Sequence, residues 1–250
     1  SVVGGKELAK NADSEVIVLS QQELTKLSAE ASGYQKVLLR EPNNDTALNG
    51  LLQIRLQQKD IPGAITPLEK LAKLHPEQTE YTILLAQAKQ QLADYEGAAV
   101  AYNQVLSEHP GDIYALGGIT NLYLTQDQPE RAIALLKKTI KLADKDDNQT
   151  TTLIEKEAVE LLLGELYTNQ ERYGEAIALY DQLHQANQDD FRPILAKALV
   201  LERQGDFTAA KPVLEKAYVA SPTDYKDQIG EQMERLVQEI KQAQKLKEQG

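Results

Sequence analysis

The chain has 250 residues with 27 basic and 38 acidic side chains, and its net charge of -11 opposes non-specific binding to nucleic-acid phosphates. It contains no cysteine, which excludes disulfides, thiolate metal sites and cysteine nucleophiles. No apolar run approaches the roughly 18 residues that a membrane-spanning helix needs, so we expect no direct membrane insertion by this segment.

The first 44 residues lead into a repetitive region. Residues 1–19 lack helical periodicity and are predicted to be a loosely ordered lead-in. From Gln21 to Glu41, apolar residues at helical spacing predict a long helix, and we assign residues 20–44 to an N-terminal capping helix that matches only part of a repeat. Because the chain begins at Ser1 rather than Met, an N-terminal anchor removed upstream is compatible with the sequence and would tether the protein to a membrane; the compartment stays open.

A unit of 34 residues repeats along the rest of the chain. A small residue recurs at that step, and once at a step of 44, at Ala64, Ala98, Ala132, Ala176 and Ala210. A proline closes the early copies at Pro42, Pro76 and Pro110. Within residues 79–110 the apolar residues form two runs at helical spacing, and Asp94 lies between them, where it is placed to cap the second helix, as are Asp60 and Asp206. Each copy is therefore predicted to form two antiparallel helices.

A 34-residue unit of two helices with recurring small, large and proline positions resembles the tetratricopeptide repeat (TPR) family over roughly residues 45–222. The resemblance implies an all-α fold, a right-handed α-solenoid of about five TPR helix pairs with capping helices at both ends. We place the five motifs in residues 45–224, with an insertion near residues 144–156, and a C-terminal capping helix in residues 225–250. The first copy departs from the family pattern, because Leu52 stands where the two helices cross and a small residue is usual.

The sequence shows no catalytic constellation, so we predict a protein that is not an enzyme and has no cofactor and no metal. The histidines His75, His109 and His184 have no further ligand in phase and are interpreted as ordinary surface residues. One alternative stays open in the insertion, where four oxygen-bearing residues match the spacing of a calcium-binding loop: Asp144, Asp146, Asn148 and Glu155. Gln149 stands where such a loop needs Gly, and we favour a solvated acidic loop in which Thr150 or Thr151 caps a lengthened helix with Glu155 in its first turns.

In the family, the first helix of each pair lines the concave side of the solenoid, and the resemblance carries that role to matching positions here. The candidate partner-binding residues are Asn49, Gln53, Gln87, Gln91, Tyr114, Gly117, Asn121 and Glu165. The remaining groove positions are Thr46, Gln57, Glu80, Ile83, Thr125, Ala158, Leu161, Asn169, Arg192, Leu195, Leu199 and Glu202. This lining is rich in side-chain amides, which can hydrogen-bond an extended peptide backbone.

Two glycines in the middle of a predicted first helix, Gly117 and Gly118, have two interpretations. They either leave the groove floor open to a ligand or allow close packing of helices at Gly118. Both interpretations remain open from the sequence.

These observations favour a non-enzymatic scaffold that binds a protein or peptide segment in the concave groove. We expect it to act as an assembly or biogenesis factor for a larger complex, for which a membrane complex is one option. The first alternative is a structural protein that self-associates, and the oligomeric state is left open. The second is an RNA-binding helical repeat, which the acidic charge disfavours, so no nucleic acid is predicted as a partner.

Overall fold

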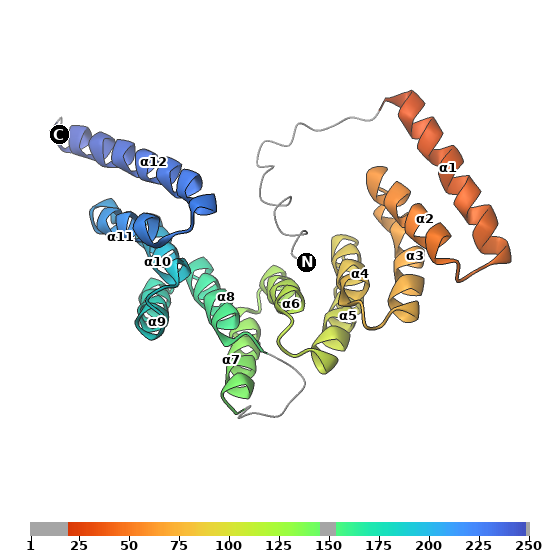
Figure 1. Ribbon diagram of the computed structural model, residues 1–250, viewed down its shortest axis with the longest axis horizontal. Helices are drawn as coiled ribbons and strands as arrows, with labels where there is room; N and C mark the ends of the chain where they lie inside the picture. Colours follow the sequence, from red (N-terminus) through yellow and green to blue (C-terminus); the bar gives the residue numbers. More distant parts are fainter. Residues whose placement is uncertain (1–19, 146–153, 249–250) are drawn as a thin grey trace. The chain divides into compact units, whose positions relative to one another are not determined.

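The structure is a computed structural model that describes residues 20–145 and 154–248, and every element in those two ranges is an α-helix (Figure 1). The predicted all-α class is therefore confirmed. The described residues fall into two compact units, divided between Ala98 and Ala99. Helix α5, Tyr95–Glu108, spans this division.

The first unit is a run of helices in which each packs against the next. These helices are α1 (Gln21–Arg40), α2 (Asp45–Gln57), α3 (Ile61–Leu74) and α4 (Thr79–Gln91). Helix α1 begins at a capping box, in which the Ser20 hydroxyl accepts from the Glu23 amide and the Glu23 carboxylate accepts from Ser20. The apolar face of α1 packs through Ala31 against Leu51 and Ile54 of α2, so these side chains leave water together.

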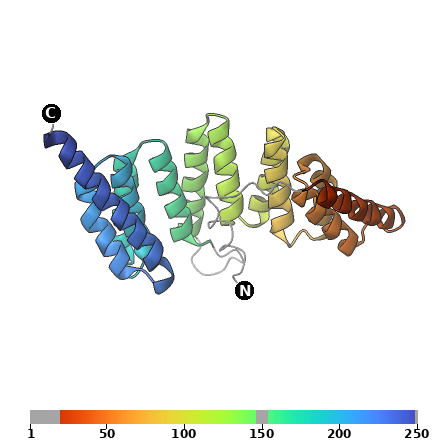
Figure 2. The ribbon, with the colours of Figure 1, turned by 90° about the horizontal axis from the view of Figure 1, so that it is seen from above.

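The second unit continues the same alternation. Its helices are α6 (Ile113–Thr125), α7 (Pro129–Lys145), α8 (Lys156–Asn169), α9 (Tyr173–Ala186), α10 (Phe191–Arg203), α11 (Phe207–Ala220) and α12 (Thr223–Glu248). Consecutive helices are in contact, as α6 and α7 illustrate in Figure 2, and α8 also contacts both α6 and α10. The first helices of successive pairs thus pack on one another, which is the stacking of a helical solenoid and agrees with the predicted architecture.

The link between the two helices of each pair has the same backbone geometry in every copy. One residue in each link has a left-handed backbone, with φ between 56° and 78°: Lys59, Ala93, Asp127, Glu171 and Gly205. The next amide reaches back five residues, as in the 2.8 Å bond from the Asp60 amide to the Arg55 carbonyl and the 2.9 Å bond from Asp94 to Lys89. This is a Schellman motif, which satisfies the carbonyls at the end of the first helix and reverses the chain.

Three aspartates cap second helices, as the sequence predicted. The Asp60 carboxylate accepts from the Gly63 amide at 2.9 Å, Asp94 accepts from the Gly97 amide at 2.9 Å, and Asp206 accepts from the Ala209 amide at 3.0 Å. Each bond satisfies one of the amides that a helix start leaves without an intrahelical acceptor.

The insertion differs from its prediction at one point. Helix α8 begins at Lys156, so Glu155 precedes the helix and its side chain makes no capping hydrogen bond; the placement of Glu155 in the first turns was wrong. The Lys156 ammonium at the start of α8 lies 2.6 Å from the Asp144 carboxylate at the end of α7. Asp146, Asn148, Thr150 and Thr151 lie outside the described residues.

Candidate functional site

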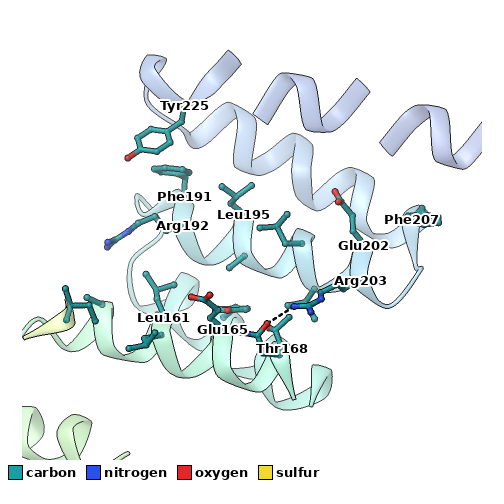
Figure 3. A pocket seen from close by; sticks show the side chains of 18 of the residues that line it. Leu161, Glu165, Thr168, Phe191, Arg192, Leu195, Glu202, Arg203, Phe207 and Tyr225 are labelled. Carbon is teal, nitrogen blue, oxygen red and sulfur yellow. Dashed lines mark hydrogen bonds between the residues drawn. The ribbon is translucent and has the colours of Figure 1, made fainter. Parts of the chain in front are cut away.

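A pocket of about 960 Å³ opens between α8, α10 and α12 in the second unit (Figure 3). Such a volume is in the range that holds a ligand of drug size or several side chains of a bound segment. The apolar lining comprises Ile113, Ala158, Leu161, Leu162, Phe191, Leu195, Ala196, Leu199, Val200, Phe207 and Tyr225, and the polar lining comprises Glu165, Thr168, Asn169, Tyr180, Arg192, Glu202, Arg203 and Glu239. The pocket is thus mainly apolar, with charged groups among its lining.

Some apolar side chains of this pocket remain exposed, so its lining is an open surface rather than core. Leu199 of α10 is 42% exposed and Tyr225 of α12 is 47% exposed. The ring of Tyr225 packs against that of Phe191 with centroids 5.0 Å apart and planes tilted by 52°, an arrangement that aromatic pairs favour. Figure 3 shows this pair above Arg192, with Leu195 on α10 and Leu161 on α8. A ligand that covered Leu199 and Tyr225 would gain free energy from removing them from water.

Both arginines of the pocket are held by neighbouring side chains. The Arg203 guanidinium donates to the Asn169 amide oxygen at 2.8 Å, which joins α10 to α8 (Figure 3). The Arg192 guanidinium donates twice to Asp190, at 2.9 and 2.7 Å, and this pairing lowers the pKa of the Asp190 carboxyl. The positive charge of Arg192 is therefore compensated by the Asp190 carboxylate, whereas Arg203 is bound to the neutral amide of Asn169.

Three carboxylates, Glu165, Glu202 and Glu239, also line the pocket. Glu165 is exposed and points from α8 into the space between α8 and α10 in Figure 3. Burial raises the pKa of Glu202 above its ordinary value of 4.5, while a hydrogen bond from Gln232 at 3.3 Å and the charge of Arg235 act in the opposite direction. At neutral pH the lining has more negative than positive charge.

The pocket gathers a block of residues that the sequence placed in the groove. Those from the last two copies all line it: Ala158, Leu161, Glu165, Asn169, Arg192, Leu195, Leu199 and Glu202. The contribution of α12, through Tyr225 and Glu239, was not predicted. Tyr225 follows Phe191 by one period of 34 residues, but residues 225–250 were assigned to a capping helix and not to the groove.

The candidate residues of the first unit do not belong to this pocket. Gln53 on α2 and both Gln87 and Gln91 on α4 are exposed. Asn49 is committed to the fold, because its amide oxygen accepts from the Tyr81 hydroxyl at 3.1 Å and its nitrogen donates to the Asp45 carbonyl at 3.0 Å. Asn49 thus ties α2 to α4.

One groove assignment in the first unit was wrong. Ile83 is only 6% exposed, although Gln87, one turn later on α4, is exposed. An apolar side chain is more stable out of water, so the position that the family pattern gives to the groove is buried here.

On α6 the predicted residues face open space. Tyr114 is 71% exposed, Asn121 is exposed, and a Cβ placed on Gly117 would have no neighbour within 4 Å. A Cβ on Gly118 would instead lie 2.3 Å from Cε1 of Tyr102, a residue that is only 1% exposed. Gly118 therefore supports close helix packing, as one of the two interpretations proposed, and Gly117 leaves its surface open.

A mainly apolar pocket on stacked first helices defines a class of protein, a helical-repeat protein with a ligand-sized groove on one face. Among the described residues, no helix is both long enough and apolar enough to span a bilayer. In that same part of the chain, no three acidic, histidine or cysteine side chains come together as a metal site.

Comparison with family models identifies the repeat. Two tetratricopeptide repeat models match residues 91–153 and 161–225, which together are just over half of the 250-residue chain, and the protein belongs to the tetratricopeptide repeat family. A comparison with curated proteins found no match. The family and its fold are typically non-enzymatic, and its members bind protein partners, so the repeats support a role as a protein-interaction scaffold.

Solved structures share the fold at low sequence identity. Yeast Tom70 aligns with a TM-score of 0.56 and 15% identity over 89% of this chain, which spans 44% of the length of that chain. A tetratricopeptide repeat protein from Parabacteroides merdae aligns with a TM-score of 0.53 and 18% identity, over 88% of this chain and 87% of that one. These similarities show that the chain shares its arrangement of helices with these two proteins.

Proposed function

We propose that the protein is a non-enzymatic scaffold that binds a segment of a partner protein in the pocket between α8, α10 and α12, and that this binding helps to assemble a larger complex. The observation that carries the proposal is the 960 Å³ pocket itself, in which Leu199 and Tyr225 stay substantially exposed. Exposed apolar and aromatic residues in a concave site are the usual anchors for a bound partner.

The first helices supply this surface because of how the repeat packs. Ala198 of α10 is fully buried, whereas Leu199, the next residue, is 42% exposed and lines the pocket. Neighbouring residues of α10 therefore have different roles: Ala198 packs the helix against the core, and Leu199 is available to a ligand. The same helices can bind a partner without any change to the core.

Site-specific photo-crosslinking tests the proposal. A benzophenone amino acid in place of Leu199 is expected to form a covalent bond to a partner protein in an extract of the native source, and excess unmodified protein should block it. The matched control carries the same group in place of Val219, which is 78% exposed on α11 and is not part of the pocket. Equal crosslinking from both positions, or crosslinking from Val219 alone, would contradict the proposal.

A further inference from the structure

The apolar and charged side chains that line the pocket between α8, α10 and α12 indicate which kind of protein segment it binds. The inference drawn from them rests on the function proposed above. Its floor is apolar, through Leu161, Leu195 and Leu199. Its charged groups are three carboxylates and two guanidiniums, of which one is neutralised by Asp190. From the structure we infer that the pocket binds an amphipathic helix of a partner protein that presents an apolar stripe and at least one lysine or arginine.

The charge of the occupant follows from the carboxylates. Glu165 is exposed beside the apolar floor, and Glu202 and Glu239 approach from α10 and α12. With Arg192 paired to Asp190, only Arg203 opposes these three negative charges within the lining. A bound segment that carried a carboxylate of its own would add like charge in a partly desolvated site, whereas a cation would compensate the charge already there.

The helical form of the occupant follows from the donors and acceptors of the pocket. An extended peptide exposes its backbone amides and carbonyls, and these groups need partners when they are buried. The Thr168 hydroxyl donates to the Gly164 carbonyl at 2.8 Å, the Asn169 oxygen accepts from Arg203 at 2.8 Å, and Arg192 is bound to Asp190. A helix satisfies its own backbone and presents only side chains, which suits a lining whose polar groups are largely committed.

This differs from the amide-rich recognition of a peptide backbone that the sequence suggested. The amides Gln53, Gln87 and Gln91 lie in the first unit, whereas the pocket of the second unit is apolar and acidic. The exposed rings and methyl groups of Tyr225 and Leu199 give the affinity in this account, and the carboxylates select the sign of the charge.

Three labelled peptides of about 14 residues test the inference, each with the same leucine stripe at helical spacing. Their polar positions are filled with lysine, glutamine or glutamate, and we name them the Lys, Gln and Glu peptides. Fluorescence anisotropy with the full chain is expected to show the affinity order Lys, then Gln, then Glu, with a ratio of about tenfold or more between the two extremes. High salt should reduce this ratio, because exposed charges are screened.

A matched pair of variants separates the pocket from the general acidity of the chain. Glu165→Gln removes a carboxylate from the pocket, and Glu231→Gln removes one from an exposed position of α12 that does not line it. We expect Glu165→Gln to weaken the Lys peptide by about three- to fivefold and to leave the Gln peptide unchanged, while Glu231→Gln changes neither. Equal losses in both variants would overturn the inference, because the attraction would then come from overall charge.

The outcomes also distinguish this inference from the function on which it rests. If all three peptides bind with equal affinity and a benzophenone group in place of Leu199 crosslinks to them, the pocket binds protein segments but the charge selection is wrong. If none of the three binds, the amphipathic-helix occupant is wrong, and the crosslinking of a native partner at Leu199 then decides the proposed function separately. If the Glu peptide binds most tightly, the assignment of the charges is wrong.

Discussion

Arg203 donates a hydrogen bond of 2.8 Å to the side chain of Asn169, one 34-residue repeat earlier in the chain. The bond joins α10 to α8 at the edge of the pocket and holds Arg203 there, while Arg192, the other arginine of the lining, is paired with Asp190. Arg203 thus has two effects of opposite sign on the protein, since it stabilises the helix stack and opposes the binding of a basic ligand.

The variant Arg203→Ala separates these two effects. Losing one exposed hydrogen bond should lower the free energy of unfolding by about 0.5–1 kcal/mol, measured by urea denaturation. Removing the positive charge should at the same time strengthen binding of the Lys peptide by about threefold, measured by anisotropy. Weaker binding of the Lys peptide by a folded Arg203→Ala protein would show that the carboxylates do not govern the pocket.

Two adjacent glycines of α6 offer a test of helix packing. Gly117→Ala should raise stability by about 0.5–1 kcal/mol, because the new methyl group enters open space and alanine favours a helix. Gly118→Ala should lower it by about 1–3 kcal/mol, because the methyl group would overlap the buried ring of Tyr102. Urea denaturation followed by circular dichroism measures both.

The preceding repeat suggests a second substitution that should restore part of the stability lost in Gly118→Ala. One repeat earlier, Leu84 and Leu68 occupy the positions of Gly118 and Tyr102. The double variant Gly118→Ala with Tyr102→Leu should therefore be more stable than the sum of the two single changes implies. Additive losses would mean that the contact between Gly118 and Tyr102 does not limit the packing.

The left-handed residue between paired helices gives a second matched pair. Ala93 adopts φ 61° and Gly205 adopts φ 78°, at equivalent positions of different copies. Ala93→Gly should raise stability by about 0.5–1 kcal/mol, and Gly205→Ala should lower it by about 1 kcal/mol, because the left-handed backbone costs less for glycine. Both residues are exposed, and a Cβ on Gly205 would meet no atom within 4 Å, so the backbone alone is tested. Calorimetric melting that shifts in the same direction for both variants would refute this explanation.

His75 supplies a pH-dependent link in the first unit. Its ring lies 3.0 Å from the Asp45 carboxylate, and Asp45, assisted by Glu77, raises the pKa of His75 above 6.5. Because the pKa is raised on folding, the contribution of this pair is fully present below about pH 6.5 and is lost as the pH rises through the higher pKa of the folded state. An NMR titration should show the pKa of His75 falling toward 6.5 in Asp45→Asn; an unchanged pKa would mean that the ion pair is absent in solution.

The repeated features of the fold could be predicted because they are local and recur. Asp60, Asp94 and Asp206 follow the same link in three copies, and their capping bonds depend on residues three positions away. The left-handed residue of each link was not predicted, because Lys59, Ala93, Asp127 and Glu171 have side chains that give no sign of a positive φ. The constraint there comes from the two helices on either side.

The sequence predicted only part of the pocket lining. The resemblance to the repeat family placed Leu161 and Leu195 in the groove, because first helices of the family present the same positions in every copy. The position of Tyr225 in the pocket depends on how α12 packs after the last repeat. The ring of Tyr225 on α12 packs against that of Phe191 on α10, and this contact between a helix after the last repeat and a helix of a repeat was not predicted. The burial of Ile83 likewise depends on tertiary packing rather than on its place in the repeat.

The most direct measurement is an NMR titration of the labelled protein with the Lys peptide, which locates the bound segment. Binding between α8, α10 and α12 predicts that the amide signals of Leu161, Leu195, Leu199 and Tyr225 shift together, with those of Val219 on α11 and of α1 to α4 unchanged. Shifts on the far side of the pairs, at Val219 of α11 or along α9, with none at Leu199, would contradict the account.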